Sequence, residues 1–221
     1  EKHGFAKNTL LIVTSDNGFA PAANVPAHAK FKHDPSAGFR GYKSDLFEGG
    51  HRVPGIFRWS GQIPARQVSD MTISSMDLLP LFCDMAGVPL PTDRKIDGAN
   101  ILAVLTGKSK KSPHEFLYYY NGSNLQAVRQ GKWKLHLPRT TADQPFWAKV
   151  GNPTVKPMLV LKENVLFDLE ADIGEKSDVA AQNPAVVAQL LKEAERIRGE
   201  LGDVRKIGTD QRPTWPGAKA N

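Results

Sequence analysis

The chain has 221 residues, a formal net charge of +6, and hydrophobic and charged fractions of 40% and 24%, which are ordinary for a globular protein. The positive excess is mild and no basic run is interleaved with aromatic residues, so we expect no nucleic-acid partner. The single cysteine, Cys83, excludes an intrachain disulfide and a thiolate metal site, and no apolar run reaches the roughly 18 residues of a membrane span.

The first predicted element is a strand at residues 9–14, which ends in a polar turn. Its apolar residues do not alternate with polar ones, a pattern typical of a strand buried on both faces. Asp16, Asn17 and Gly18 follow at once, and this triplet is common in turns because Asn and Gly tolerate left-handed backbone angles. The same Asp and Asn also offer hard oxygen ligands for calcium or magnesium. The residues alone leave both interpretations open.

Residues 19–43 form a long stretch rich in Ala, Pro, His and Gly without a clear period. Loops of this length in compact domains are usually functional or disordered. A second short strand is predicted at 53–59, and we expect it to be the companion of the first strand in a parallel sheet. Four basic side chains lie between the end of this stretch and the start of the second strand: Arg40, Lys43, His51 and Arg52. They could surround an anion or could be ordinary solvated charges.

The next elements are helical. Residues 77–87 predict a helix capped by Asp77 and ended by Gly87. Apolar residues recur in it at helical spacing, and we expect Cys83 to be a buried, inert thiol on that face. A second, shorter helix is predicted at 99–105.

The texture of the sequence changes after about residue 113. Three short β-prone runs broken by Gly, Asn and Lys predict an antiparallel sheet: "EFLYYYN", "LQAVRQGKWKLHL" and "ENVLFDLE". A last helix is predicted at 184–201, where one apolar stripe should lie on that sheet. We therefore expect one domain at residues 1–110 and a second at 111–221.

Several segments together resemble the C-terminal half of a type I sulfatase, a member of the alkaline phosphatase superfamily. "TLLIVTSDNG" is followed after a loop by "FRGYKSDLFEGGHRVPGIFRWSGQIP". The later segments agree in order and spacing with the family's elements: "SSMDLLPLFCDMAGVPLP", "IDGANILAVLTGK", "LQAVRQGKWKLHL" and "LFDLEADIGEKSDVAAQNP". Ile173 departs from the family, which usually has Pro there. The resemblance implies an α/β fold: the C-terminal part of a sulfatase-type mixed sheet flanked by helices, plus a small antiparallel sheet with one packed helix.

The resemblance also implies roles for particular residues. Asp16 and Asn17 match the pair that binds a divalent cation, usually Ca2+, and Lys43 matches the catalytic lysine that contacts the sulfate group. A cation and an ammonium group at that place would stabilise the charge that develops when the ester is cleaved. His33 and Arg40 lie in the loop that borders the substrate pocket in such enzymes, which makes them candidates for substrate binding.

Part of the family's active site is not found in this sequence. The family's nucleophile is a formylglycine made from Cys or Ser in a Cys/Ser-x-Pro-Ser-Arg motif, which does not occur here. We expect that nucleophile, and the remaining metal-binding and sulfate-binding residues, in the missing N-terminal half of the enzyme, present as a second chain or a lost segment. Residues 1–221 alone should then be a poor monomer, inactive on sulfate esters.

Three functions are compatible with these observations. One is a part of a sulfuric ester hydrolase acting on a sulfated small molecule or a sulfated glycan, which the "FEGGHRVP" segment favours. The others are a phosphoesterase of the same superfamily and a non-catalytic carbohydrate-binding remnant. The resemblance is compatible with periplasmic, secreted or lysosomal export, and the sequence does not identify the compartment.

Overall fold

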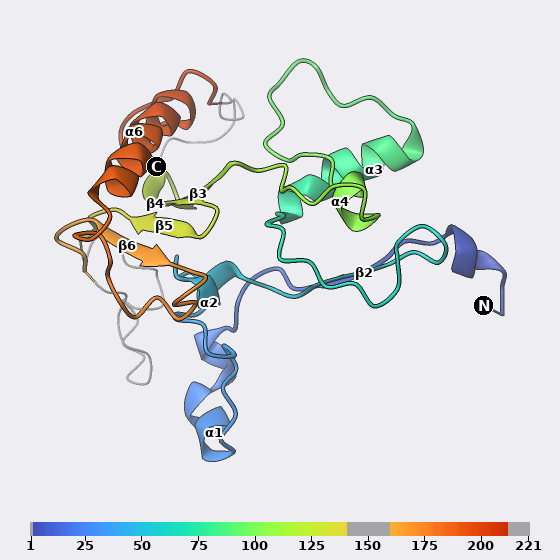
Figure 1. Cartoon of the computed structure of the whole chain (residues 1–221), viewed down its shortest axis with the longest axis horizontal. Helices are drawn as coiled ribbons and strands as arrows, with labels where there is room; N and C mark the ends of the chain where they lie inside the picture. The colour runs from blue at the N-terminus through green and yellow to red at the C-terminus, as the bar shows by residue number, and fades with distance from the viewer. Residues whose placement is uncertain (1, 141–159, 212–221) are drawn as a thin grey trace. The chain divides into compact units, whose positions relative to one another are not determined.

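The computed structural model describes residues 2–140 and 160–211, and the chain divides into two compact units. The first unit consists of Glu1–Asp16 and Val53–Glu115, and the second of Asn17–Arg52 and Phe116–Asn221. Figure 1 follows the chain from end to end. The segment 17–52, which the sequence assigned to the first domain, belongs to the second compact unit by its contacts. The division into family domains at 110/111 stays a prediction.

The first unit contains a two-stranded sheet of β1 (Leu11–Thr14) and β2 (Gly55–Arg58). The strands are antiparallel, with Ile12 opposite Phe57, so the predicted parallel pairing is wrong. A hydrogen bond from the Gly18 amide to the Gly50 carbonyl, at 2.9 Å, explains the direction. It closes the connecting segment soon after β1 ends and before β2 begins, so β2 starts at the end where β1 stops, whereas parallel strands need a crossover.

The residues that the structure describes do not bury the first strand on both faces, although the sequence predicted this burial. Leu11 is 50% exposed and Val13 49%, and Ile56 on β2 is 59% exposed. The apolar residues of β1 do not alternate with polar ones, but the described part of the chain leaves these side chains about half exposed. Covering them would stabilise the fold by roughly 25 cal/mol per Å² of apolar surface removed from water.

Three segments of the first unit are joined by one buried carboxylate. Asp77 is fully buried, and its oxygens accept from the Ser74 amide at 2.7 Å and the Ala99 amide at 2.8 Å, with His114 Nε2 at 2.7 Å. The expected cap therefore ties three segments together. Cys83 is half-buried, less enclosed than expected. The unit's helices are η1 (Phe5–Asn8), η3 (Ser75–Asp77), α3 (Leu78–Ala86), which confirms the predicted helix, and α4 (Leu102–Leu105).

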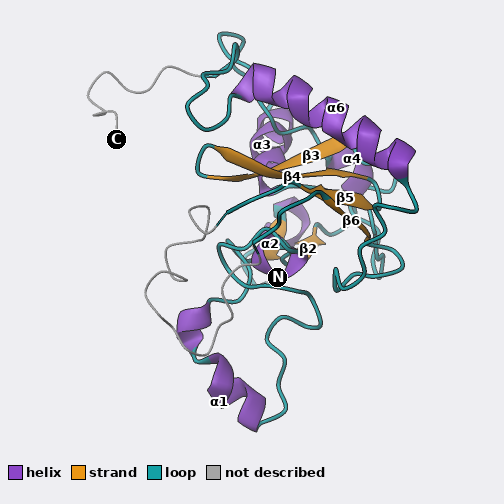
Figure 2. Cartoon of the chain, turned by 90° about the vertical axis from the view of Figure 1, so that its left-hand side faces the viewer, coloured by secondary structure: helices purple, strands orange, loops and turns teal. Residues whose placement is uncertain are grey.

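The second unit is built on a four-stranded sheet in sequence order, and its antiparallel pairing confirms the antiparallel sheet predicted from the sequence. Helix α6 (Pro184–Leu201) has the predicted bounds and lies across one face of this sheet (Figure 2). The strands are β3 (Phe116–Asn121), β4 (Asn124–Gln130), β5 (Trp133–His136) and β6 (Val165–Asp168). Sheet and helix share one core of buried side chains: Leu125, Val128, Leu135, Leu137, Leu166, Leu190, Ala194 and Ile197. The chain thus has a mixed α/β fold with small antiparallel sheets.

The segment 17–52 of the second unit carries three short helices. They are η2 (Pro21–Ala23), α1 (Val25–Lys30) and α2 (Glu48–His51). Asn24 caps α1, since its side chain accepts from the Ala27 amide at 3.3 Å. Helix α2 contains the Gly-Gly pair of "EGGH" and is buried at Glu48, Gly49 and Gly50. This buried turn lies in the same segment as Arg40 and Lys43, two of the residues that the sequence analysis named.

Candidate active-site segment

The turn after β1 carries two of the predicted ligands. Asp16 is exposed, and Ser15 Oγ lies 3.5 Å from its Oδ1. Asn17 is half-buried, and its Nδ2 donates to the Gly18 carbonyl at 3.2 Å, which fixes the orientation of the amide group. Because the two residues are consecutive, the turn offers a carboxylate and an amide oxygen side by side in the chain.

Lys43 belongs to a segment whose main chain is hydrogen-bonded to the residues that follow this turn. Its amide donates to the Phe19 carbonyl at 3.0 Å, and the Gly18 amide donates to the Gly50 carbonyl at 2.9 Å. The main chain that follows Asn17 is therefore bonded to the segment that carries Lys43. Within the second unit, the structure therefore bonds Lys43 to Phe19, two residues after Asn17.

Three glycines make this close approach of main chains feasible. A Cβ atom on Gly18 would lie 1.8 Å from the Gly49 carbonyl oxygen. On Gly49 it would lie 2.3 Å from the Gly41 oxygen, and on Gly50 2.0 Å from the Asp45 oxygen. No side chain fits at any of these positions, since real Cβ atoms do not approach a carbonyl so closely. The "DNG", "RGYK" and "EGG" stretches of the sequence are packed backbone against backbone.

Arg40 and His33, the residues expected to border the substrate, have different surroundings. Arg40 Nη1 donates to the Glu175 carbonyl at 2.5 Å, and its guanidinium lies 4.0 Å from the centre of the Phe47 ring. His33 is exposed, with its ring 5.1 Å from that of His28. Arg40 is thus directed at groups of the protein, whereas His33 is accessible.

The arrangement of four basic side chains around an anion is only partly compatible with the structure. Arg52 Nη1 pairs with Glu48 Oε2 at 3.2 Å, and the His51 ring lies 4.8 Å from that of Tyr119. Together with Arg40, these side chains are directed at partners inside the second unit. For Arg52 the physical reason is the carboxylate of Glu48, which the sequence interpretation did not consider and which attracts this cation.

Sequence reasoning missed a group that we call the buried ion cluster, made of Glu48, Lys134, His136 and Glu175. The Lys134 ammonium lies 2.9 Å from Glu48 Oε1 and 3.2 Å from Glu175 Oε1. His136 Nε2 lies 2.8 Å from Glu175 Oε1, and all four side chains are at most 2% exposed. The one available signal was their position inside three of the family-like segments, "FEGGHRVP", "GKWKLHL" and "DIGEK".

The charges of the cluster shift one another's pKa values. Burial alone raises the pKa of Glu48, but the Lys134 ammonium outweighs it and lowers that pKa to about 2. Burial likewise lowers the pKa of Lys134, yet the adjacent carboxylates, Glu48 first, leave it above its usual value. The pKa of Glu175 is raised, because burial outweighs the attraction of Lys134. Glu48 and Lys134 are therefore a charged pair at neutral pH.

His136 is neutral in this environment. Burial, followed by the Lys134 charge, lowers its pKa well below the usual value. Arg139 Nη1 lies 3.3 Å from His136 Nδ1 and, as a cation, can only donate. The proton of the neutral ring therefore sits on Nε2 and is donated to Glu175. This fixed tautomer completes the hydrogen bonding of the cluster.

The chemistry of the turn after β1 fits part of a calcium site. Calcium takes about six to eight oxygen ligands, and Asp16 with Asn17 can supply hard oxygen donors of the right kind. Within residues 2–140 and 160–211 there is no group of three or more His, Cys, Asp or Glu side chains arranged to hold a metal ion. The described residues thus suit a contributing pair and not a complete site.

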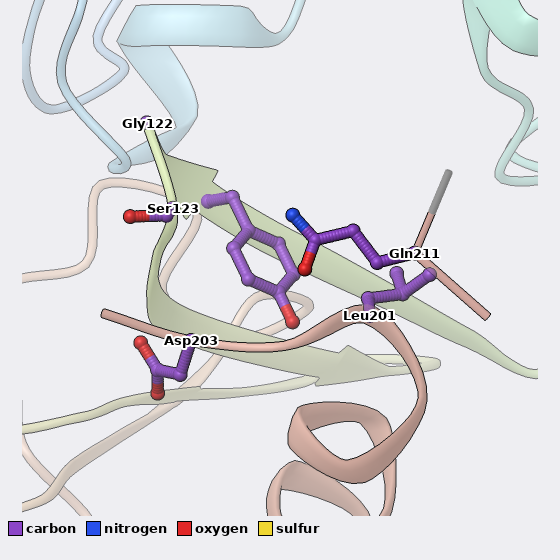
Figure 3. A pocket seen from close by; sticks show the side chains of 6 residues that line it. Gly122, Ser123, Leu201, Asp203 and Gln211 are labelled. Atoms are coloured by element: carbon purple, nitrogen blue, oxygen red, sulfur yellow. The ribbon is translucent and has the colours of Figure 1, made fainter. Parts of the chain in front are cut away.

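A cavity of about 350 Å³ lies elsewhere in the second unit, between the β3–β4 turn and the end of α6 (Figure 3). Tyr120 Oη, at its wall, donates to the Gly202 carbonyl at 3.1 Å. None of the five sequence-predicted site residues lines it; its walls are formed by Tyr120, Gly122, Ser123, Leu201, Asp203 and Gln211. In the described ranges, no helix is long and apolar enough to cross a membrane.

Comparisons with known proteins agree with this fold and these motifs. The family profile described as "Sulfatase" matches residues 1–88, and that described as "C-terminal region of aryl-sulfatase" matches residues 112–216. Steryl-sulfatase of Homo sapiens is 43% identical over 124 residues, covering 56% of this chain and 21% of that protein. N-acetylgalactosamine-6-O-sulfatase of Bacteroides thetaiotaomicron is 31% identical over 196 residues, covering 86% of this chain and 36% of that protein.

Solved structures show the same relationship. A Bacteroides thetaiotaomicron structure, described in connection with the metabolism of multiple glycosaminoglycans, superposes with a TM-score of 0.73 at 30% identity. It covers 87% of this chain and 39% of its own. A sulfatase from Pseudoalteromonas sp. shares the fold, with a TM-score of 0.69 at 24% identity over 89% of this chain and 38% of its own.

Fold and motifs together define the C-terminal portion of the sulfatase architecture. The chain belongs to the sulfatase family. It spans between about a fifth and a third of the length of the two curated relatives described above.

Proposed function

We propose that this chain supplies metal-binding and sulfate-binding residues for the hydrolysis of sulfate esters. In this proposal Asp16 and Asn17 are ligands of Ca2+, and Lys43 contacts the sulfate group. The observation that carries it is the hydrogen bond from the Lys43 amide to the Phe19 carbonyl at 3.0 Å. This bond holds the proposed sulfate-binding segment against the residues that follow the proposed ligand pair.

The roles follow from the chemistry of a sulfate ester. A bound Ca2+ would act as a Lewis acid on the sulfate oxygens. The Lys43 ammonium binds the sulfate by charge and hydrogen bonding and holds it in a fixed orientation. The Asn17 amide, fixed by its bond to Gly18, directs a neutral oxygen without adding negative charge beside the anionic substrate. The formylglycine nucleophile of the family would come from outside this chain.

The class of substrate is proposed from the relatives. One of them is named for a steryl sulfate and another for a sulfated N-acetylgalactosamine, so both a sulfated small molecule and a sulfated glycan are candidates. His33 is the better candidate for contact with the non-sulfate part of the substrate, because it is exposed, whereas Arg40 is bonded to Glu175.

The test uses the complete enzyme that contains this segment. Asp16→Ala should lower Ca2+ affinity and turnover of an aryl sulfate by orders of magnitude, since the ion loses a charged ligand. Lys43→Ala should lower kcat/KM on the same substrate by about 10²-fold or more while Ca2+ affinity changes little. Asp93→Ala is the matched control, because the Asp93 side chain is 64% exposed and pairs with the neighbouring Arg94.

Three outcomes would contradict the proposal. Unchanged calcium dependence in Asp16→Ala would remove the metal role. A preference of the wild-type enzyme for an aryl phosphate over an aryl sulfate would favour the phosphoesterase instead. Absence of any hydrolysis in a calcium-loaded complete protein would favour the carbohydrate-binding alternative.

A further inference from the structure

The buried ion cluster lies between the antiparallel sheet and the segment that carries Lys43. Lys134 and His136 belong to β5, at the centre of the second unit, while Glu48 begins α2. Glu175 comes from the turn after β6. All these residues are in one compact unit, so their contacts are internal to it.

Glu175 bonds both ends of the stretch from Arg40 to Glu48. Its Oε2 accepts from the Glu48 main-chain amide at 2.6 Å, and its carbonyl accepts from Arg40 Nη1 at 2.5 Å. Lys43 lies between these two points. A single residue therefore fixes the stretch on both sides of the proposed sulfate-binding lysine.

The cluster in turn fixes Glu175. Lys134 and His136 donate to its Oε1, and its backbone has φ of +50°, which is unusual for a residue other than glycine. Such a conformation costs about 1–3 kcal/mol and persists only where the surroundings impose it. The position of Glu175 is thus determined by the sheet and not by local preference.

A contribution to stability alone does not account for this arrangement. Burying two carboxylates and an ammonium costs several kcal/mol per ion, and well-packed apolar residues of the same volume are often equal or better for stability. Apolar groups, however, cannot direct a main-chain amide to one place. Hydrogen bonds from Glu175 to the stretch 40–48 can, since they have a preferred length and direction.

We propose that Glu175, supported by Glu48, Lys134 and His136, is a positioning residue that sets the location of Lys43 relative to the turn at Asn17. The link to Asn17 runs through the Gly18 amide, which donates to the carbonyl of Gly50 in the same helix α2. The geometric part of this inference stands on the contacts above. Its consequence for sulfate binding rests on the proposed function of Lys43.

Hydrogen exchange in the complete enzyme tests the geometric part. Glu175→Gln should raise amide exchange in residues 17–19 and 40–50 by about tenfold or more, while β4 and α6 keep their protection. Glu175→Asp, which keeps the charge but shortens the side chain, is the second variant in case the first fails to fold. Lys132→Met is the control, because Lys132 pairs with Asp168 and is 37% exposed.

Kinetics test the consequence. A displacement of about 1 Å at a reacting group costs roughly 10²-fold in rate, so kcat/KM on an aryl sulfate should fall by that order in Glu175→Gln while Ca2+ still binds. Glu175→Asp should recover part of the loss, and Lys132→Met should lose nothing.

The results separate the two proposals. Exchange that rises evenly over the sheet, or does not rise in residues 40–50, overturns the positioning role even if the enzyme is a sulfatase. Normal kcat/KM in Glu175→Gln, in an enzyme whose kcat/KM does fall in Lys43→Ala, overturns it as well. Local exchange that rises as expected in a protein without sulfatase activity would retain the geometry and reject the proposed function.

Discussion

The two antiparallel sheets of this chain differ in how they are covered. In β4, β5 and α6 the core residues Val128, Leu135 and Leu190 are fully buried. In β1, Leu11 is half exposed although the strand is more uniformly apolar. The comparison shows that an apolar run indicates a strand that can be buried. Whether it is buried depends on a helix or sheet that packs against it. The second unit contains its own covering helix, and β1 remains half exposed within the described residues.

The largest expected effect contrasts a buried lysine and an exposed lysine of the second unit. Lys134→Met removes the buried ammonium between Glu48 and Glu175, and should lower the free energy of unfolding by about 3–5 kcal/mol, although Glu48 keeps its ion pairs with Arg52 and Arg129. Lys132→Met removes an exposed partner of Asp168 and should cost about 0–1 kcal/mol. Urea denaturation followed by circular dichroism measures both. Equal losses of unfolding free energy in the two variants would mean that the buried ion cluster does not depend on Lys134.

A second contrast compares apolar side chains from the two sheets. Leu190→Ala opens a cavity between α6 and the sheet and should cost about 2–5 kcal/mol. Leu11→Ala, at a side chain that is 50% exposed, should cost about 1 kcal/mol or less in residues 1–221. The same denaturation assay applies. A Leu11 variant as damaging as the Leu190 variant would show that β1 is covered in solution.

The third prediction is a loss of stability in mild acid that arises in the second unit. Burial and the Lys134 charge lower the pKa of His51 to about 4, against 6.5 when unfolded. The unfolded chain therefore binds a proton first, so stability is complete above pH 6.5 and falls as the pH drops toward 4, by roughly 3 kcal/mol.

Glu48, with its pKa lowered to about 2, adds a further loss only below pH 4.5. The raised pKa of Glu175 acts in the opposite direction, since its neutral form favours the folded state. The lowered pKa of His136 adds a loss in the same direction as His51. Thermal melting between pH 7 and 4 of wild type and His51→Phe isolates the part that His51 contributes. An equally steep slope in His51→Phe would refute the assignment to His51.

The sequence was sufficient for the elements whose signal is local. The apolar stripe of α6 predicted residues 184–201, because a helix that packs on a sheet needs that spacing. The short β-prone runs, broken by Gly, Asn and Lys, predicted β3–β6, because this signal is also local. The direction of β2 could not be predicted, since it depends on the bond between Gly18 and Gly50, which are far apart in the chain.

The site was predictable only in part. Asp16, Asn17 and Lys43 stand in recognisable motifs, and their roles stay predictions. The buried ion cluster was missed because Glu48, Lys134 and Glu175 are distant in sequence, and each looks like an ordinary solvated charge on its own. Only folding shows that they are within 3.2 Å of one another.

The most direct test of this account is native-state hydrogen exchange on residues 1–221, resolved by segment. If the second unit holds its own core and positions Lys43, amides of β4, β5 and α6 should be strongly protected, and those of 40–50 moderately so. Amides of β1 and β2 should exchange fast, because their pair of strands is only marginally stable without cover. Protection of β1 equal to that of β4, or none in residues 40–50, would contradict it.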